Sequence, residues 1–105
     1  MKRALQGLLI AGEKMKASVL DGTKRITIRE GHRDYTEGPV LIGCHILNWA
    51  TIRNIISVKY TTLGVVTQEE YQADGFETKS EMLDGLIKFY PTINWESPVT
   101  ILTWN

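Results

Sequence analysis

The longest apolar run of the chain, PVLIGCHIL at residues 39–47, has the length of a single strand. A membrane-spanning helix needs about 20 apolar residues, so we expect neither such a helix nor a membrane partner. The run follows a turn-rich loop and is apolar at nearly every position, which is typical of a strand buried on both faces. We therefore expect a central strand over residues 40–47.

Further strand-length segments lie on both sides of this run. Residues 53–62 alternate with period two, which directs successive side chains to opposite faces of a sheet. Residues 25–29 (RITIR) alternate in the same way, with the two isoleucines on one face and Arg25, Thr27 and Arg29 on the other. Residues 4–10 and 99–104 are predicted as the first and last strands.

Three segments have the pattern of short helices. Residues 12–21 place apolar side chains on one face and are followed by Gly22, a favoured residue after a helix C-terminus. The segments 67–70 (TQEE) and 78–81 (TKSE) both match the capping box that opens a helix, and we expect the second helix to end before Pro91. The order of elements predicts one α+β domain over residues 1–105, a small mixed β-barrel with two or three short helices.

Cysteine content bears on location and on metal binding. Cys44 is the single cysteine, which excludes an internal disulfide and leaves no thiolate cluster for zinc. We expect a buried thiol and a reducing, cytoplasmic location, and the sequence offers no cluster of metal ligands. The basic and then apolar N-terminus is short and interrupted by glycine, so we interpret it as mature protein rather than a signal peptide.

Charge is distributed unevenly along a chain whose formal net charge is zero. Residues 1–33 hold eight Lys or Arg against three Asp or Glu, and residues 34–105 hold four against nine. One interpretation is a basic face for an anionic or phosphate-bearing partner. The other is that the two halves of the chain pair with each other in the fold.

The crowded cations of residues 22–29, GTKRITIR, carry a recognisable motif. Gly22, Lys24, Thr27 and Arg29 match the pattern G-x-K-x-x-T-x-R, and this segment resembles the ASCH family. Supporting segments follow in the family's order: TEGPVLI, then YTTLGVVTQEEYQADGF, then a helix ending in FYP and a closing strand. The resemblance spans roughly residues 17–104 and implies a PUA-like β-barrel.

Small bacterial members of that family are most similar to this sequence, and they are amidohydrolases that deacetylate N4-acetylcytidine. The resemblance implies a catalytic set of Lys24, Thr27 and Glu81, with no metal or organic cofactor. It also implies that Arg29 assists the binding of the substrate or transition state. We add the nearby Arg25 and Arg33 to the expected substrate-binding residues, and we expect a nucleoside as the small-molecule partner.

The chemistry of these residue types is consistent with that activity. A threonine hydroxyl is a weak nucleophile until a base removes its proton. A lysine serves as that base when burial and neighbouring cations lower its pKa, and Arg25 and Arg29 are such neighbours. Lys24 and Thr27 are three residues apart, so an ideal strand would place them on opposite faces. The two side chains meet only if Lys24 lies in the turn before the strand.

Each candidate residue also has a purely structural interpretation. Glu81 is explained as a capping residue, and Lys24 and Arg29 as solvated surface charges. The three tryptophans are expected to pack in the core rather than to stack on a base. Other members of the family bind or cleave RNA, so RNA is the alternative partner of the same basic cleft, although a net charge of zero argues against strong RNA affinity.

Overall fold

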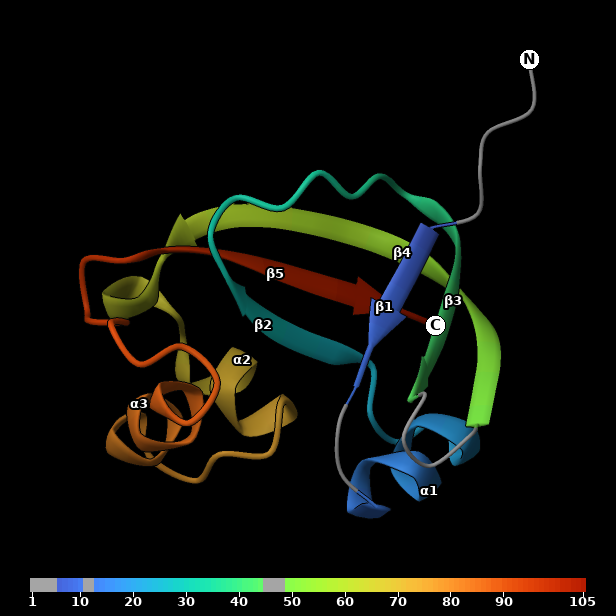
Figure 1. Cartoon of the computed structure of the whole chain (residues 1–105), viewed down its shortest axis with the longest axis horizontal. Coiled ribbons are helices and arrows are strands. Elements are labelled where there is room, and N and C mark those ends of the chain that lie inside the picture. The colour runs from blue at the N-terminus through green and yellow to red at the C-terminus, as the bar shows by residue number, and fades with distance from the viewer. Residues whose placement is uncertain (1–5, 11–12, 45–48) are drawn as a thin grey trace.

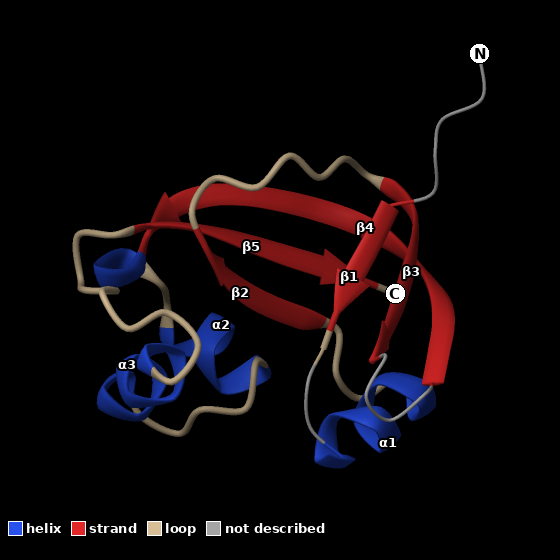
Figure 2. Cartoon of the chain, in the orientation of Figure 1, coloured by secondary structure: helices blue, strands red, loops and turns tan. Residues whose placement is uncertain are grey.

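The structure is a computed structural model that describes residues 6–10, 13–44 and 49–105. In this part of the chain five strands form one mixed sheet, and three α-helices and one 3-10 turn accompany it (Figures 1 and 2). In chain order these are β1 (Gln6–Leu9), α1 (Glu13–Asp21), β2 (Ile26–Glu30), β3 (Gly38–Cys44), β4 (Trp49–Thr62), η1 (Leu63–Val65), α2 (Gln68–Ala73), α3 (Lys79–Ile87) and β5 (Pro98–Trp104).

Each strand and helix predicted from the sequence has a counterpart in the fold. The largest difference is in β4, which begins at Trp49 rather than at residue 53 because it pairs with β3 as far as Cys44. The predicted strand 40–47 begins at Gly38, and its last three residues lie outside the described chain, as do residues 4, 5 and 12 of two other predicted elements.

The sheet has the strand order β1-β3-β4-β5-β2 and curls into a half-barrel. β1 runs parallel to β3, and all other neighbours are antiparallel. β1 and β2 are the two edges, and the curl brings them close enough for Arg29 Nη2 to donate to the carbonyl oxygen of Leu9 at 2.7 Å. A register shift between Ile55 and Ser57 accompanies the bend of β4.

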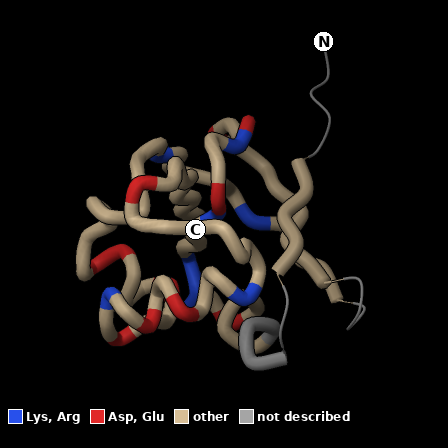
Figure 3. The backbone as a smooth tube through the Cα atoms, turned by 60° about the vertical axis from the view of Figure 1, so that its left-hand side comes forward, with Lys and Arg blue, Asp and Glu red and all other residues tan. Residues whose placement is uncertain are grey.

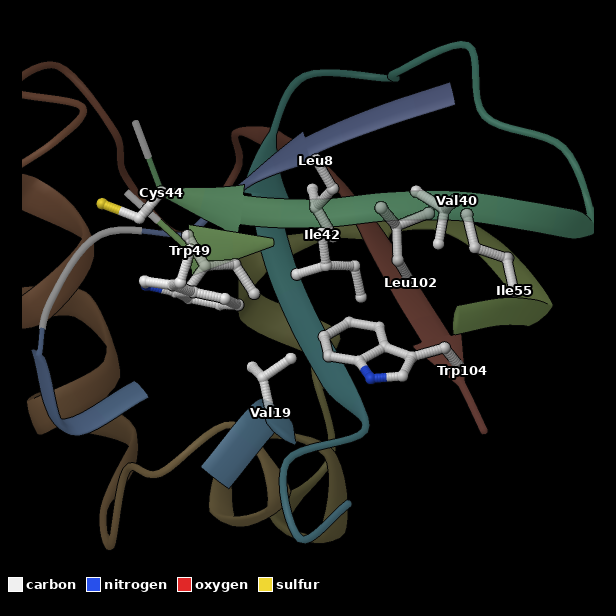
Figure 4. Packing of buried hydrophobic residues seen from close by; sticks show 10 residues of the cluster. Leu8, Val19, Val40, Ile42, Cys44, Trp49, Ile55, Leu102 and Trp104 are labelled. Atoms are coloured by element: carbon white, nitrogen blue, oxygen red, sulfur yellow. The ribbon is translucent and has the colours of Figure 1, made fainter. Parts of the chain in front are cut away.

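The helices cover the inner face of this arch at its two ends. Val19 of α1 packs with Ile42, Trp104 and other buried residues of one cluster (Figure 4). α2 and α3 lie together at the other end, where Met82 and Leu86 pack with Ile28 of β2 (Figure 1). The two clusters are centred on different ends of the sheet. Ile10 of the first cluster and Ile28 and Leu86 of the second line a cavity beside the edge strand β2.

The two predicted capping boxes have different outcomes. In α2 both hydrogen bonds are present, since Thr67 Oγ1 accepts from the Glu70 amide and the Glu70 carboxylate accepts from the Thr67 amide. In α3 the hydroxyl of Thr78 accepts from the Glu81 amide, but the Glu81 carboxylate accepts from the amide of Glu77 at 2.9 Å. The second box is therefore half formed, and Glu81 caps the residue before Thr78 instead.

Replacing Thr67 with alanine tests the capping of α2. We expect a loss of about 1 kcal/mol in the free energy of unfolding, because the Glu70 amide loses its acceptor. Urea unfolding of the wild type and the variant measures this difference. An unchanged midpoint would contradict the role of the cap.

Positions of Lys and Arg and positions of Asp and Glu are interspersed along the described backbone (Figure 3). Two ion pairs are present among the described residues, Lys24–Asp74 and Lys59–Glu70. The first joins the basic and the acidic halves of the chain, as the second interpretation of the charge pattern predicted. Among the described helices, none has the length and apolar character required to cross a membrane.

Candidate active site

A cavity of about 330 Å³ lies where the edge strand β2 meets α2 and α3. Its polar lining comes from Lys24, Thr27, Arg29 and Asp74. Its apolar lining includes the end of β1 on one side and Phe76, Phe89 and Tyr90 on the other. The cavity therefore combines charged groups and aromatic rings in one lining.

Lys24 lies in the turn between α1 and β2, since the strand begins only at Ile26. Its exposed fraction is 6 %, and Nζ donates to the carbonyl oxygen of Ile26 at 2.8 Å. Because Lys24 precedes the regular strand, it lines the same cavity as Thr27 despite their spacing of three. This is the arrangement that the motif requires if the two side chains are to act together.

Asp74 is the carboxylate that meets Lys24. It caps the C-terminus of α2, has an exposed fraction of 8 %, and Oδ1 accepts a hydrogen bond from Lys24 Nζ in a buried ion pair. The backbone amide of Ile28 also hydrogen-bonds to the Asp74 carboxylate. The carbonyl of Ile26 and the amide of Ile28 are on the free edge of β2, so the Lys24–Asp74 pair also satisfies edge groups that have no strand partner.

Thr27 and Arg29 occupy alternate positions of β2 beside this pair. Thr27 is 5 % exposed, much less than a surface threonine. Arg29 Nη2 donates a hydrogen bond to the Leu9 carbonyl, but Arg29 Nε is buried without a hydrogen-bond partner. A buried donor without an acceptor is costly.

Burial raises the pKa of the Asp74 carboxyl above its usual range, although Lys24 and then Arg29 act in the opposite direction. Desolvation therefore outweighs the attraction of the cations. A carboxyl that keeps its proton more readily is a better proton donor near neutral pH. The pair thus places a proton-donating group and an amine within one hydrogen bond of each other.

Comparison of the chain with protein-family models, curated proteins and solved structures finds no match. What this site can do chemically therefore follows from its own residues.

The remaining predicted site residues lie away from this cavity. Glu81 is exposed on the first turn of α3, and its carboxylate is engaged with the Glu77 amide. Arg25 lines a different surface hollow, and its Nε donates to the carbonyl of Gly22 at 2.7 Å. Arg33 donates through Nε to the carbonyl of Glu30 at 2.7 Å. Of the six predicted residues, the structure brings together Lys24, Thr27 and Arg29.

Asp74 and the aromatic side of the cavity were not predicted as site residues. The sequence held one signal for Asp74. An acidic residue at a helix C-terminus interacts unfavourably with the helix dipole, so its presence there indicates a compensating tertiary contact. The tryptophans were expected to be core residues; Trp49 and Trp104 are buried, as is Cys44. The third, Trp95, is 38 % exposed and lies under the Lys79 ammonium at 5.3 Å, so the prediction of a core position is wrong for this residue.

Proposed function

We propose that this protein is an amidohydrolase that removes the acyl group from N4-acetylcytidine or a related acylated nucleoside. In this proposal Thr27 is the nucleophile, Lys24 its base and Asp74 the acid, in place of Glu81, the carboxylic residue of the catalytic set that the resemblance to the ASCH family implies. The half-barrel is then a PUA-like barrel of that family, and the enzyme works in the cytoplasm. The observation that carries the proposal is the buried Lys24–Asp74 pair lining one cavity with Thr27.

The pair provides both proton transfers that an amide cleavage needs. When the proton resides on Asp74, the neutral amine of Lys24 accepts the Thr27 proton as Oγ1 bonds to the acyl carbon. The Asp74 carboxylic acid then protonates the leaving N4 nitrogen as the C–N bond breaks. The products of this half-reaction are cytidine and an acetyl ester on Thr27.

Water completes the cycle with the roles reversed. The Asp74 carboxylate takes a proton from the attacking water, and the Lys24 ammonium returns one to Thr27 Oγ1 as the ester bond breaks. Acetic acid leaves and ionises in the solvent, and the starting protonation state of the three residues is restored. Arg29 lines the cavity, and its guanidinium supplies a donor for the oxyanion that develops in both half-reactions.

The aromatic lining supports a planar leaving group. Phe89 is 66 % exposed although it lines the cavity, and Phe76 and Tyr90 lie on the same side. Rings in such positions stack on a nucleobase, which offers a flat π-surface of its own. An aliphatic amide would gain less from these contacts.

RNA binding or cleavage at the same cleft is the second candidate function, and the basic first third of the chain favours it. However, Arg25 and Arg33 engage carbonyls outside the cavity, and Lys24 is paired with Asp74. Phosphate binding needs cations that are free to contact the backbone of the nucleic acid. The geometry therefore supports the nucleoside amidohydrolase better.

The decisive experiment incubates the purified protein with N4-acetylcytidine and follows cytidine by chromatography. We expect turnover by the wild type, a fall in kcat of about 10²-fold in Asp74→Asn, and near-normal kcat in Glu81→Gln. The glutamine variant is a matched control, because it removes a carboxylate charge outside the cavity. Absence of turnover by the folded wild type would overturn the proposed activity, and loss in Glu81→Gln alone would return the acid role to Glu81.

A further inference from the structure

A short turn after α2 sets the position of Asp74. Gly75 adopts a positive φ of 108°, in the region that favours glycine. The next residue, Phe76, donates its backbone amide to the Tyr71 carbonyl at 2.9 Å. The turn therefore places Phe76, two residues after Asp74, in the aromatic lining of the same cavity.

The ring of Phe76 lies against Gly85 of α3 with no space between them. A Cβ added at Gly85 would lie 2.5 Å from Phe76 Cε1 and 3.0 Å from Cζ, closer than real side chains approach. Glycine inside a helix is destabilising relative to alanine. The close packing of the Phe76 ring therefore explains why glycine, which is unfavourable inside a helix, occupies position 85.

We propose that Gly85 is a positioning residue that acts through Phe76 to hold the Asp74 carboxylate against Lys24. The slot at Gly85 anchors the ring to α3, and the ring anchors the turn two residues after the carboxylate. This inference rests on the proposed function in so far as Asp74 is the acid of the reaction. Its effect on the Asp74 side chain does not depend on any activity.

The test replaces Gly85 with alanine, whose methyl group displaces the Phe76 ring. We expect the pKa of Asp74, followed by the ¹³C chemical shift of its carboxyl carbon, to shift, because displacing the Phe76 ring changes both the burial of the carboxyl and its contact with Lys24. The described charged groups that act on this carboxyl are Lys24 and Arg29, and neither is changed by the substitution. With N4-acetylcytidine we expect kcat to fall at least about tenfold because the acid moves, and KM to rise as well because the displaced Phe76 ring belongs to the aromatic lining.

Two further variants separate positioning from general damage. Gly7→Ala is the matched control, because its added methyl group meets nothing within 4 Å, and we expect wild-type values for both readouts. Phe76→Leu in the Gly85→Ala background removes the clash, and we expect it to restore most of the Asp74 pKa and of kcat. Phe76→Trp makes the ring too large for the slot, whereas Gly85→Ala makes the slot too small for the ring. We therefore expect the same changes in the Asp74 pKa and in kcat from both variants.

The outcomes distinguish this inference from the proposed function. An unchanged Asp74 pKa in folded Gly85→Ala or Phe76→Trp overturns the positioning role. A shifted pKa that the double variant restores supports the positioning role even when no protein, the wild type included, releases cytidine. That combination would reject the amidohydrolase and leave the positioned Lys24–Asp74 pair in need of another substrate.

Discussion

Thr27→Val is expected to lower kcat/KM for N4-acetylcytidine at least about 10³-fold, because it removes the nucleophile. Valine nearly matches threonine in shape and is equally suited to a strand. Since Thr27 is buried and lines the cavity with Lys24, the variant keeps the packing of β2 and loses only the hydroxyl group. Initial rates of cytidine release, with thermal unfolding to verify the fold, measure the effect.

Two companion variants sharpen this test. Thr27→Ser retains a hydroxyl and is expected to keep part of the activity. Thr103→Val makes the same chemical change on β5, opposite Ile26 and away from the lining of the cavity, and should leave the rate unchanged. A valine variant at position 27 with activity within tenfold of the wild type would contradict the nucleophile, and salt-dependent RNA binding that survives it would favour the alternative function.

Lys24→Met is expected to lower the free energy of unfolding by about 3–5 kcal/mol, because it leaves the buried Asp74 carboxylate without its cation. Lys24→Met combined with Asp74→Leu replaces the pair by apolar side chains and should recover most of that loss. Urea unfolding measures both. Cytidine release should be absent from both variants, so the double variant separates stability from activity. A single variant as stable as the wild type would contradict a buried pair.

The same pair predicts a pH dependence of stability. Because burial raises the folded-state pKa of Asp74 above its ordinary value of 3.8, the folded chain binds more protons than the unfolded chain between the two values. The stability due to protonated Asp74 is fully present below the ordinary value and is lost as the pH rises through the folded-state value. We expect Tm to decline more steeply over this window in the wild type than in Asp74→Asn. The other carboxyl groups titrate in both proteins and do not affect the comparison. A steeper decline of Tm in Asp74→Asn than in the wild type would contradict the raised pKa.

Local patterns in the sequence predicted the elements of the fold well. Alternation in residues 25–29 and 53–62 indicated β2 and β4, and Thr67 and Thr78 marked the starts of two helices. Their ends were less certain, because pairing partners extend a strand beyond its own alternation, as Cys44 does for β4 at Trp49. Alternation, helix starts and strand ends depend on residues close in the sequence or on the residue paired in the adjacent strand.

The site was predicted in part, and the division has a physical cause. The motif identified Lys24, Thr27 and Arg29, all within six residues, and the turn before β2 was the condition for the first two to meet. The sequence offered Glu81 as the carboxylate, whereas Asp74 is the carboxylate that lines the cavity with this motif, because a capping position and a catalytic position look alike in sequence when no partner is known. Glu81 in fact binds the Glu77 amide.

The sequence alone determined an α+β chain of short strands and helices with a cationic motif at the start of one strand. Only the tertiary structure decided which acid the motif meets, since Lys24 and Asp74 are fifty residues apart. The strand order leaves β2 at an edge of the sheet, and the C-terminus of α2 lies against this edge with Asp74. Burial at that junction pairs the two charges and raises the pKa of the carboxyl, and no local pattern encodes either effect.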